Sequence, residues 1–102
     1  MARRHQLHEI LCDILGTRNV YFQPPASVFL KYPCLKYTLS GIDIRRADNG
    51  VYKRINRYEV IAIDPNPDSD IVDKMLGTFP MCSFDRWYAA DNLNHYVFTL
   101  YY

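Results

Sequence analysis

An acidic turn in the middle of the chain has the composition and spacing closest to those of a metal-binding loop. Residues with side-chain oxygens recur there at every second position, and they are Asp64, Asn66, Asp68 and Asp70. Calcium loops of the EF-hand type place oxygen ligands in this way, but they also need glycine at the sixth position and a bidentate glutamate at the twelfth. Ser69 and Met75 occupy those two positions here. We therefore predict Asx turns and a helix N-cap at Asp70, and we expect no metal ion and no cofactor.

A second group of metal-ligand residue types lies on a predicted N-terminal helix. His5 and Cys12 are about 10.5 Å apart along the helix axis, so one ion cannot bind both of them together with His8. The three residues fall away from the apolar stripe of the same helix. We expect them on its solvated surface.

The cysteines are the side chains best suited to nucleophilic catalysis, but their spacing does not indicate activation. Cys34 and Cys82 lie in strand-like segments, where cysteine usually packs as a small apolar side chain. His95 begins the last predicted strand and could reach either thiol, although nothing in the spacing requires it. Three cysteines without a secretory signal indicate free thiols in a reducing compartment. We expect no catalytic residue and no enzymatic activity.

Basic residues flank a predicted hairpin turn at Asp48-Asn49-Gly50. They are Arg45, Arg46, Lys53, Arg54 and Arg57, with Tyr52 and Tyr58 between them. Residues 1–57 hold ten Lys/Arg and four Asp/Glu, or +6, whereas residues 58–102 hold two and seven, or −5. A basic ribbon suits contacts with phosphates, and an acidic protein surface would suit it equally well. A third interpretation is that the charges intermix in the folded chain.

Periodicity predicts the elements that must position these residues. An apolar stripe indicates a helix that ends at Gly16, and its members are Leu7, Ile10, Leu11, Ile14 and Leu15. Alternating patterns predict strands over 19–23, 33–40, 51–64, 81–88 and 94–102. A polar connection over 41–50 joins two of them into a hairpin with a projecting tip, and a short helix over 71–76 is closed by Gly77.

This order of elements predicts an α+β fold: an N-terminal helix on a mostly antiparallel sheet of four or five strands. The strand through Val60 and Ala62 is apolar on both faces, so it should be central. We expect Leu7, Leu11, Ile14 and Leu15 to pack on it and on Phe98 and Leu100. The chain has 102 residues, 49% of them hydrophobic, which predicts one ordered domain over 1–102 and excludes a disordered chain. No apolar run is long enough to span a membrane.

Several phrases of the sequence stand out together from Val20 onward. They are Val20-Tyr21-Phe22-Gln23-Pro24-Pro25, Tyr32-Pro33-Cys34-Leu35-Lys36-Tyr37, Arg57-Tyr58-Glu59-Val60, the acidic turn 64–73, Met81-Cys82-Ser83-Phe84-Asp85-Arg86, Asp91-Asn92-Leu93-Asn94-His95 and Val97-Phe98-Thr99-Leu100-Tyr101-Tyr102. The chain resembles small proteins encoded among the structural genes of tailed bacteriophages, and in particular the tail terminator (tail completion) proteins. The resemblance covers nearly the whole chain.

The resemblance implies a virion structural protein of the tail or neck, made in the cytoplasm of the host bacterium. Tail terminators form a ring, usually a hexamer, that joins the tail tube to the capsid connector, and their α+β subunits carry a long hairpin. The implied partners are further copies of the chain, tail-tube and connector proteins, and DNA passing non-specifically through the lumen, with no membrane. The basic hairpin would then meet an acidic surface of the next subunit at Asp64, Asp68, Asp70 and Asp73, beside exposed aromatics such as Tyr52 and Trp87. The alternative from the residues alone is a small nucleic-acid-binding or nuclease module.

Overall fold

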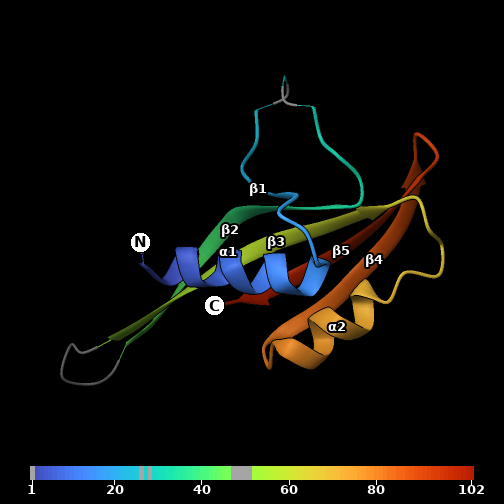
Figure 1. Ribbon diagram of the computed structural model, residues 1–102. Helices are drawn as coiled ribbons and strands as arrows, with labels where there is room; N and C mark the ends of the chain where they lie inside the picture. The colour runs from blue at the N-terminus through green and yellow to red at the C-terminus, as the bar shows by residue number, and fades with distance from the viewer. Residues whose placement is uncertain (1, 26, 28, 47–51) are drawn as a thin grey trace.

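The computed structural model describes residues 2–25, 27, 29–46 and 52–102, with the side chains of 2–3, 44–46 and 52–54 left out of the description. The elements follow one another as α1 (Ala2–Leu15), β1 (Val20–Phe22), β2 (Cys34–Arg46), β3 (Tyr52–Asp64), α2 (Ile71–Thr78), β4 (Cys82–Ala90) and β5 (Leu93–Tyr101). These described strands form one sheet in the order β1-β2-β3-β5-β4 (Figure 1). The α+β fold with a mostly antiparallel sheet and an N-terminal helix is confirmed.

The middle of the sheet is β3, as the apolar character of both its faces predicts. It pairs antiparallel with β2 on one side and with β5 on the other, and β4 continues the sheet beyond β5. β1 is the exception, because it runs parallel to β2 and pairs with residues 35–37 alone. The peptide bond between Tyr32 and Pro33, just before β2, is cis.

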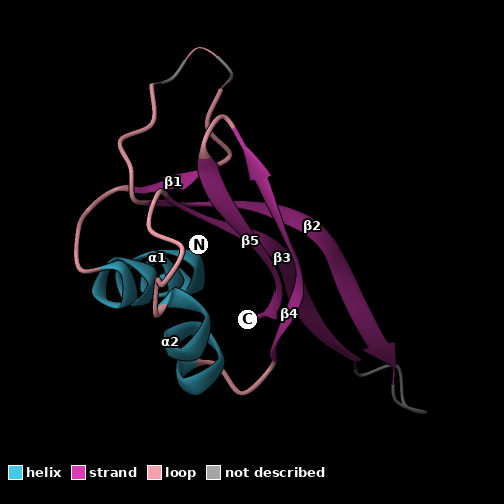
Figure 2. Cartoon of the chain, turned by 90° about the vertical axis from the view of Figure 1, so that its right-hand side faces the viewer, coloured by secondary structure: helices cyan, strands magenta, loops and turns pink. Residues whose placement is uncertain are grey.

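Both helices lie on the same side of the sheet (Figure 2). The core between them and the sheet contains the side chains that the helical stripe predicts, with Ile10 and Leu15 only partly buried. Its fully buried members include Leu7, Leu11, Tyr37, Val60, Phe98 and Leu100. Among the described residues, no helix has the length and apolar character that crossing a membrane requires.

Two predicted boundaries are wrong. Residues 41–46, predicted as a loop, continue β2, because the alternation of Ile42 and Ile44 with charged residues suits a strand paired to β3. The second helix runs past Gly77 to Thr78, where the Phe79 amide still donates to the Met75 carbonyl. Leu39 lies on the same face of β2 as the buried Leu35 and Tyr37, but it is 41% exposed.

Each outer part of the sheet contains a β-bulge. In β2 the register shifts between Leu39 and Gly41, which leaves Ser40 as the extra residue. In β4 it shifts between Phe84 and Arg86, which leaves Asp85 as the extra residue. A bulge changes which later side chains share a face, so it determines the surface that each edge presents.

Candidate subunit interface

The basic hairpin predicted from the sequence forms one end of an elongated molecule, whose largest dimension is 52 Å. β2 and β3 project together beyond the helices (Figure 1). Their register places Arg45 directly opposite Lys53, and Arg54 opposite Ile44. The side chains of Arg45, Arg46, Lys53 and Arg54 lie outside the described residues.

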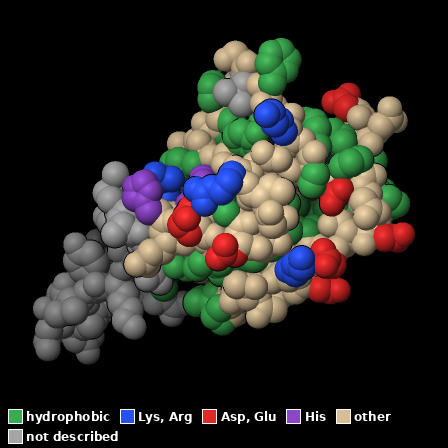
Figure 3. Space-filling view, in the orientation of Figure 1, with side chains coloured by type: hydrophobic (Ala, Val, Ile, Leu, Met, Phe, Trp, Pro, Cys, Tyr) green, Lys and Arg blue, Asp and Glu red, His purple; other side chains and the backbone are tan. Residues whose placement is uncertain are grey.

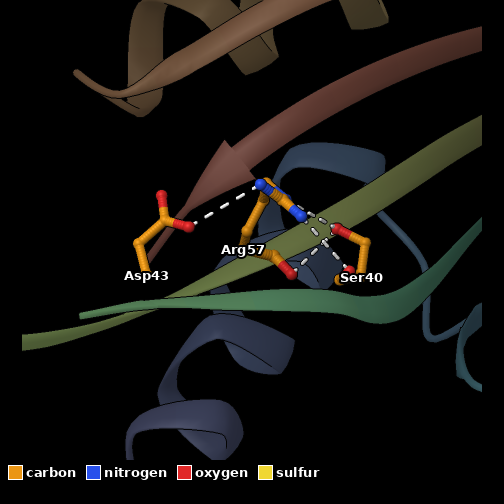
Figure 4. Close-up of polar contacts among 3 residues, drawn as sticks. All are labelled: Ser40, Asp43 and Arg57. Atoms are coloured by element: carbon orange, nitrogen blue, oxygen red, sulfur yellow. Dashed lines mark hydrogen bonds and ion pairs between the residues drawn. The ribbon is translucent and has the colours of Figure 1, made fainter.

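Arg57, the fifth basic residue, is held at the base of the hairpin (Figure 4). Its Nη1 lies 3.7 Å from Oδ1 of Asp43, and its Nη2 donates to the Ser40 carbonyl at 3.4 Å. The Ser40 hydroxyl donates in turn to the Arg57 carbonyl at 3.0 Å. The guanidinium lies where a Cβ at Gly41 would be, so glycine makes room for it. The Arg57 side chain therefore stabilises the β2 bulge, and the Asp43 carboxylate partly balances its charge.

The acidic turn has the structure that its sequence predicts, except at the helix cap. Asp64 Oδ1 accepts the Asn66 amide at 2.8 Å, and Asn66 Oδ1 accepts the Asp68 amide at 3.0 Å, which confirms the Asx turns. Asp70 stands at the N-cap position of α2 but its side chain makes no capping bond. The Ser69 hydroxyl accepts the Ile71 amide instead (3.3 Å). The Asp70 carboxylate lies 3.4 Å from Nζ of Lys74.

The acidic residues lie at the opposite end of the sheet from the hairpin tip. β3 joins the two ends, and its 13 residues span about 40 Å at 3.3 Å per residue. Figure 3 shows several acidic side chains gathered on the right-hand side of the molecule, away from the hairpin. The structure thus does not bring Asp64, Asp68, Asp70 or Asp73 to the basic hairpin of the same chain. Within the described residues, no three His, Cys, Asp or Glu side chains form a group that could hold a metal ion.

The expected solvation of His8 and Cys12 on α1 is wrong. Cys12 is buried in the core, and Nδ1 of His8 lies 2.8 Å from the Tyr37 hydroxyl. The buried face of α1 includes more residues than the Leu/Ile stripe, because the Tyr37 side chain of β2 packs beside this part of the helix. Burial, followed by the nearby positive charges of Arg18 and Arg4, lowers the pKa of His8. His5 is exposed, as predicted.

The remaining cysteines lack the surroundings of a catalytic nucleophile. Cys34 is fully buried and Cys82 is half-buried, and burial raises the pKa of each thiol to about 11. His95 is turned to other partners: its ring stacks on Tyr88 with centroids 4.6 Å apart, and its Nδ1 lies 3.2 Å from the Leu93 carbonyl oxygen. A thiolate is the reactive form of cysteine, so a raised pKa opposes nucleophilic chemistry at pH 7.

Apolar side chains that the sequence interpretation did not single out are exposed at both edges of the sheet. Leu39 and Ile42 lie on the β2 side, and Phe84 lies on the β4 side beside Trp87, which is 54% exposed. Trp87 was expected to be exposed, and its indole N–H donates to Asn94 Oδ1 at 3.2 Å. The bulge at Ser40 places Ile42 on the face of Leu39, which the alternation of residues does not show.

Comparisons of the chain with protein-family models, with curated proteins and with solved structures found no match.

Proposed function

We propose that this chain is a structural subunit of a tailed-bacteriophage virion, a tail terminator that forms a ring at the junction of head and tail. In this proposal the chain has no catalytic step. Its partners are further copies of itself, the tail tube and the connector, and DNA passes through the lumen of the ring.

The observation that carries the proposal is the division of the molecule into two unlike ends. A hairpin rich in basic residues projects at one end, and the acidic turn lies about 40 Å away along β3. A closed ring requires a head-to-tail contact, in which one face of each subunit meets a different face of the next. Oppositely charged ends favour that orientation over a symmetric contact of like with like.

The architecture supports the same proposal. A sheet covered by helices on one side, with a long hairpin extending beyond them, is what the sequence resemblance implies for a tail terminator subunit. The hairpin sequence holds four basic residues, Arg45, Arg46, Lys53 and Arg54. An acidic neighbour or the phosphates of DNA would stabilise it, and both are expected partners in a ring around a DNA channel.

The test is the assembly state of the purified chain. Native mass spectrometry should show a discrete oligomer, expected to be a hexamer, and electron microscopy should show closed rings. Replacing Arg45, Arg46 and Arg54 with Glu should weaken assembly at low salt. Adding Asp68→Lys and Asp70→Lys to the same chain should restore it, because the two ends then carry exchanged charges. Lys31→Glu and Lys36→Glu are the control, since these lysines belong neither to the basic hairpin nor to the acidic turn.

A different result would favour the alternative function. A chain that stays monomeric at all concentrations and binds duplex DNA with a steep salt dependence would be a nucleic-acid-binding module. Rings that persist unchanged after the reversal at the hairpin would show that the basic end faces the lumen or solvent, not the neighbouring subunit.

A further inference from the structure

The sheet ends in two edges that no other described strand covers. β4 pairs with β5 on one side only, along its whole length. β1 covers β2 at residues 35–37, and the side-chain oxygen of Gln23 accepts the Leu39 amide at 3.2 Å. Beyond that point, residues 41–46 of β2 pair with β3 alone among the described strands. The molecule thus presents two lengths of unpaired strand on opposite sides of one sheet.

Both edges expose apolar side chains on the same face of the sheet. Leu39 pairs with Tyr58 of the core, and Ile42 pairs with Asn56, two residues before Tyr58 on the same face. At the other edge, the bulge at Asp85 brings Trp87 onto the face of Phe84. Phe84 pairs with Phe98, and Trp87 pairs with Tyr96. Phe98 and Tyr96 both belong to the core beneath the helices. Exposed apolar residues along an unpaired edge are a site for association with another chain.

The open face of the sheet carries one acidic and one basic side chain near each edge. Asp43 lies on this face of β2, where it faces Arg57 at 3.7 Å, and its side chain is 44% exposed. Arg86 lies on the same face of β4, since it pairs with Val97, and it is exposed. On the face away from the helices, the β2 edge therefore presents Asp43 beside Arg57, and the β4 edge presents Arg86 next to Asp85. Each edge offers a carboxylate and a guanidinium that a second copy could pair with in antiparallel register.

From these features we infer that β4 of one copy pairs with residues 41–46 of β2 in the next copy, so that one sheet continues from subunit to subunit. This inference deepens the ring proposal and rests on it. Strand directions alternate from β2 to β3, β5 and β4, so β4 and the next β2 meet antiparallel. In the register that brings Asp43 opposite Arg86, Ile42 meets Trp87 on the helix side. Asp43 and Arg86 meet on the open side.

The experiment uses one disabling substitution at each edge. Ile42→Glu blocks the β2 edge, and Trp87→Glu blocks the β4 edge, while each chain keeps its other edge intact. Phe29→Glu is the matched control, because Phe29 is 96% exposed and lies on the connection between β1 and β2. Circular dichroism and thermal melting establish that each variant folds. Trp87→Ala is a milder second variant, expected to weaken association at least about tenfold, as truncation of a buried interfacial tryptophan does.

Sedimentation velocity gives the expected outcomes. The wild type and Phe29→Glu should form the same oligomer, and each edge variant alone should be monomeric. An equal mixture of the two edge variants should form a dimer and nothing larger, since only one competent contact remains between them. A mixture that stays monomeric, or an Ile42→Glu chain that assembles like the wild type, overturns the inference. If Ile42→Glu assembles like the wild type while Trp87→Glu stays monomeric, the contact is instead a symmetric pairing of two β4 strands.

Failure of the inference and failure of the proposed function give different results. Rings that form normally from both edge variants would contradict the edge contact alone. Open filaments or dimers that depend on both edges would support the contact and contradict a tail terminator ring. A wild-type chain that remains monomeric at every concentration would overturn both.

Discussion

The covered centre of the sheet and its two edges are built from similar residues but differ in what contacts them. In the centre, Val60 and Phe98 are fully buried beneath the helices. At the edges, Ile42 and Trp87 have equal or greater apolar area and about half of it remains exposed. The free energy that such side chains contribute depends on the area that they remove from water. The centre therefore stabilises the fold of one chain, whereas the edges hold apolar area that is free to stabilise contact between chains.

The largest effect should come from the centre. Leu11→Ala removes a fully buried side chain between α1 and the sheet, and it should lower the free energy of unfolding by about 2–5 kcal/mol. Leu76→Ala is the control, since Leu76 is 43% exposed on α2 and should cost under about 1 kcal/mol. Urea titration of both variants measures the difference. Equal losses in the two would mean that α1 does not lie on the sheet as described.

Thiol reactivity should separate the same two regions. At pH 8 a pKa of about 11 lowers the thiolate fraction of Cys34 and Cys82 by about 100-fold relative to an ordinary thiol. Cys82 begins the edge strand and is half-buried, whereas Cys34 is fully buried, so iodoacetamide should modify Cys82 first. Mass spectrometry of the native chain follows the order, and labelling in urea supplies the unprotected rate. Modification of Cys34 before Cys82 would contradict the full burial of Cys34 at the start of β2.

A pH dependence should arise at the helix side of the centre, beside Tyr37. The folded pKa of His8 lies below its unfolded value of 6.5, because burial and the charges of Arg18 and Arg4 disfavour the imidazolium, against an opposite effect of Glu9. The unfolded chain then binds the proton more readily, so stability is fully present above pH 6.5 and falls as the pH drops toward the folded pKa. Urea melts at several pH values should show this fall in the wild type and a smaller one in His8→Gln. A steeper fall in the variant would mean that the folded chain binds the His8 proton more readily than the unfolded chain, which contradicts the prediction.

The smallest effect should come from the β2 edge. Gly41→Ala places a methyl group where the Arg57 guanidinium lies, so the side chain must move away from Ser40 and Asp43. The lost contacts are half-exposed and should cost under about 1 kcal/mol. A double-mutant cycle checks the cause, because Gly41→Ala should cost nothing, or stabilise the strand slightly, in a chain that already carries Arg57→Ala. An unchanged cost in that background would place the strain elsewhere.

Much of the centre was predictable from the sequence because its periodicity is regular. The stripe of α1 and the alternation through Tyr96, Phe98 and Leu100 correctly identify the buried faces. The wider buried arc of α1 was missed, because it depends on Tyr37, a side chain from another element. The parallel pairing of β1 was also missed, since a strand of three residues carries no signal of direction.

The edges were less predictable for a specific physical reason. Alternation assigns Phe84 and Arg86 to one face and Asp85 and Trp87 to the other. The bulge at Asp85 instead brings Trp87 beside Phe84, and the Asp85 carboxylate accepts hydrogen bonds from Ser83 and Thr99 on the opposite face. A single residue inserted into the pairing reverses every later assignment. The candidate contact surface thus became visible only with the register of the strands.

The two bulges also have a consequence for the curvature of an assembly. A bulge bends its strand and increases the local twist. The bulges at Ser40 and Asp85 lie in the two strands that would join consecutive subunits, so together they set the rotation from one copy to the next. A ring closes only when that rotation divides the full circle evenly, and any pitch along the axis produces a spiral instead. Deleting either bulge residue would therefore alter the size or the closure of the assembly, even where the chemistry of the contact is unchanged.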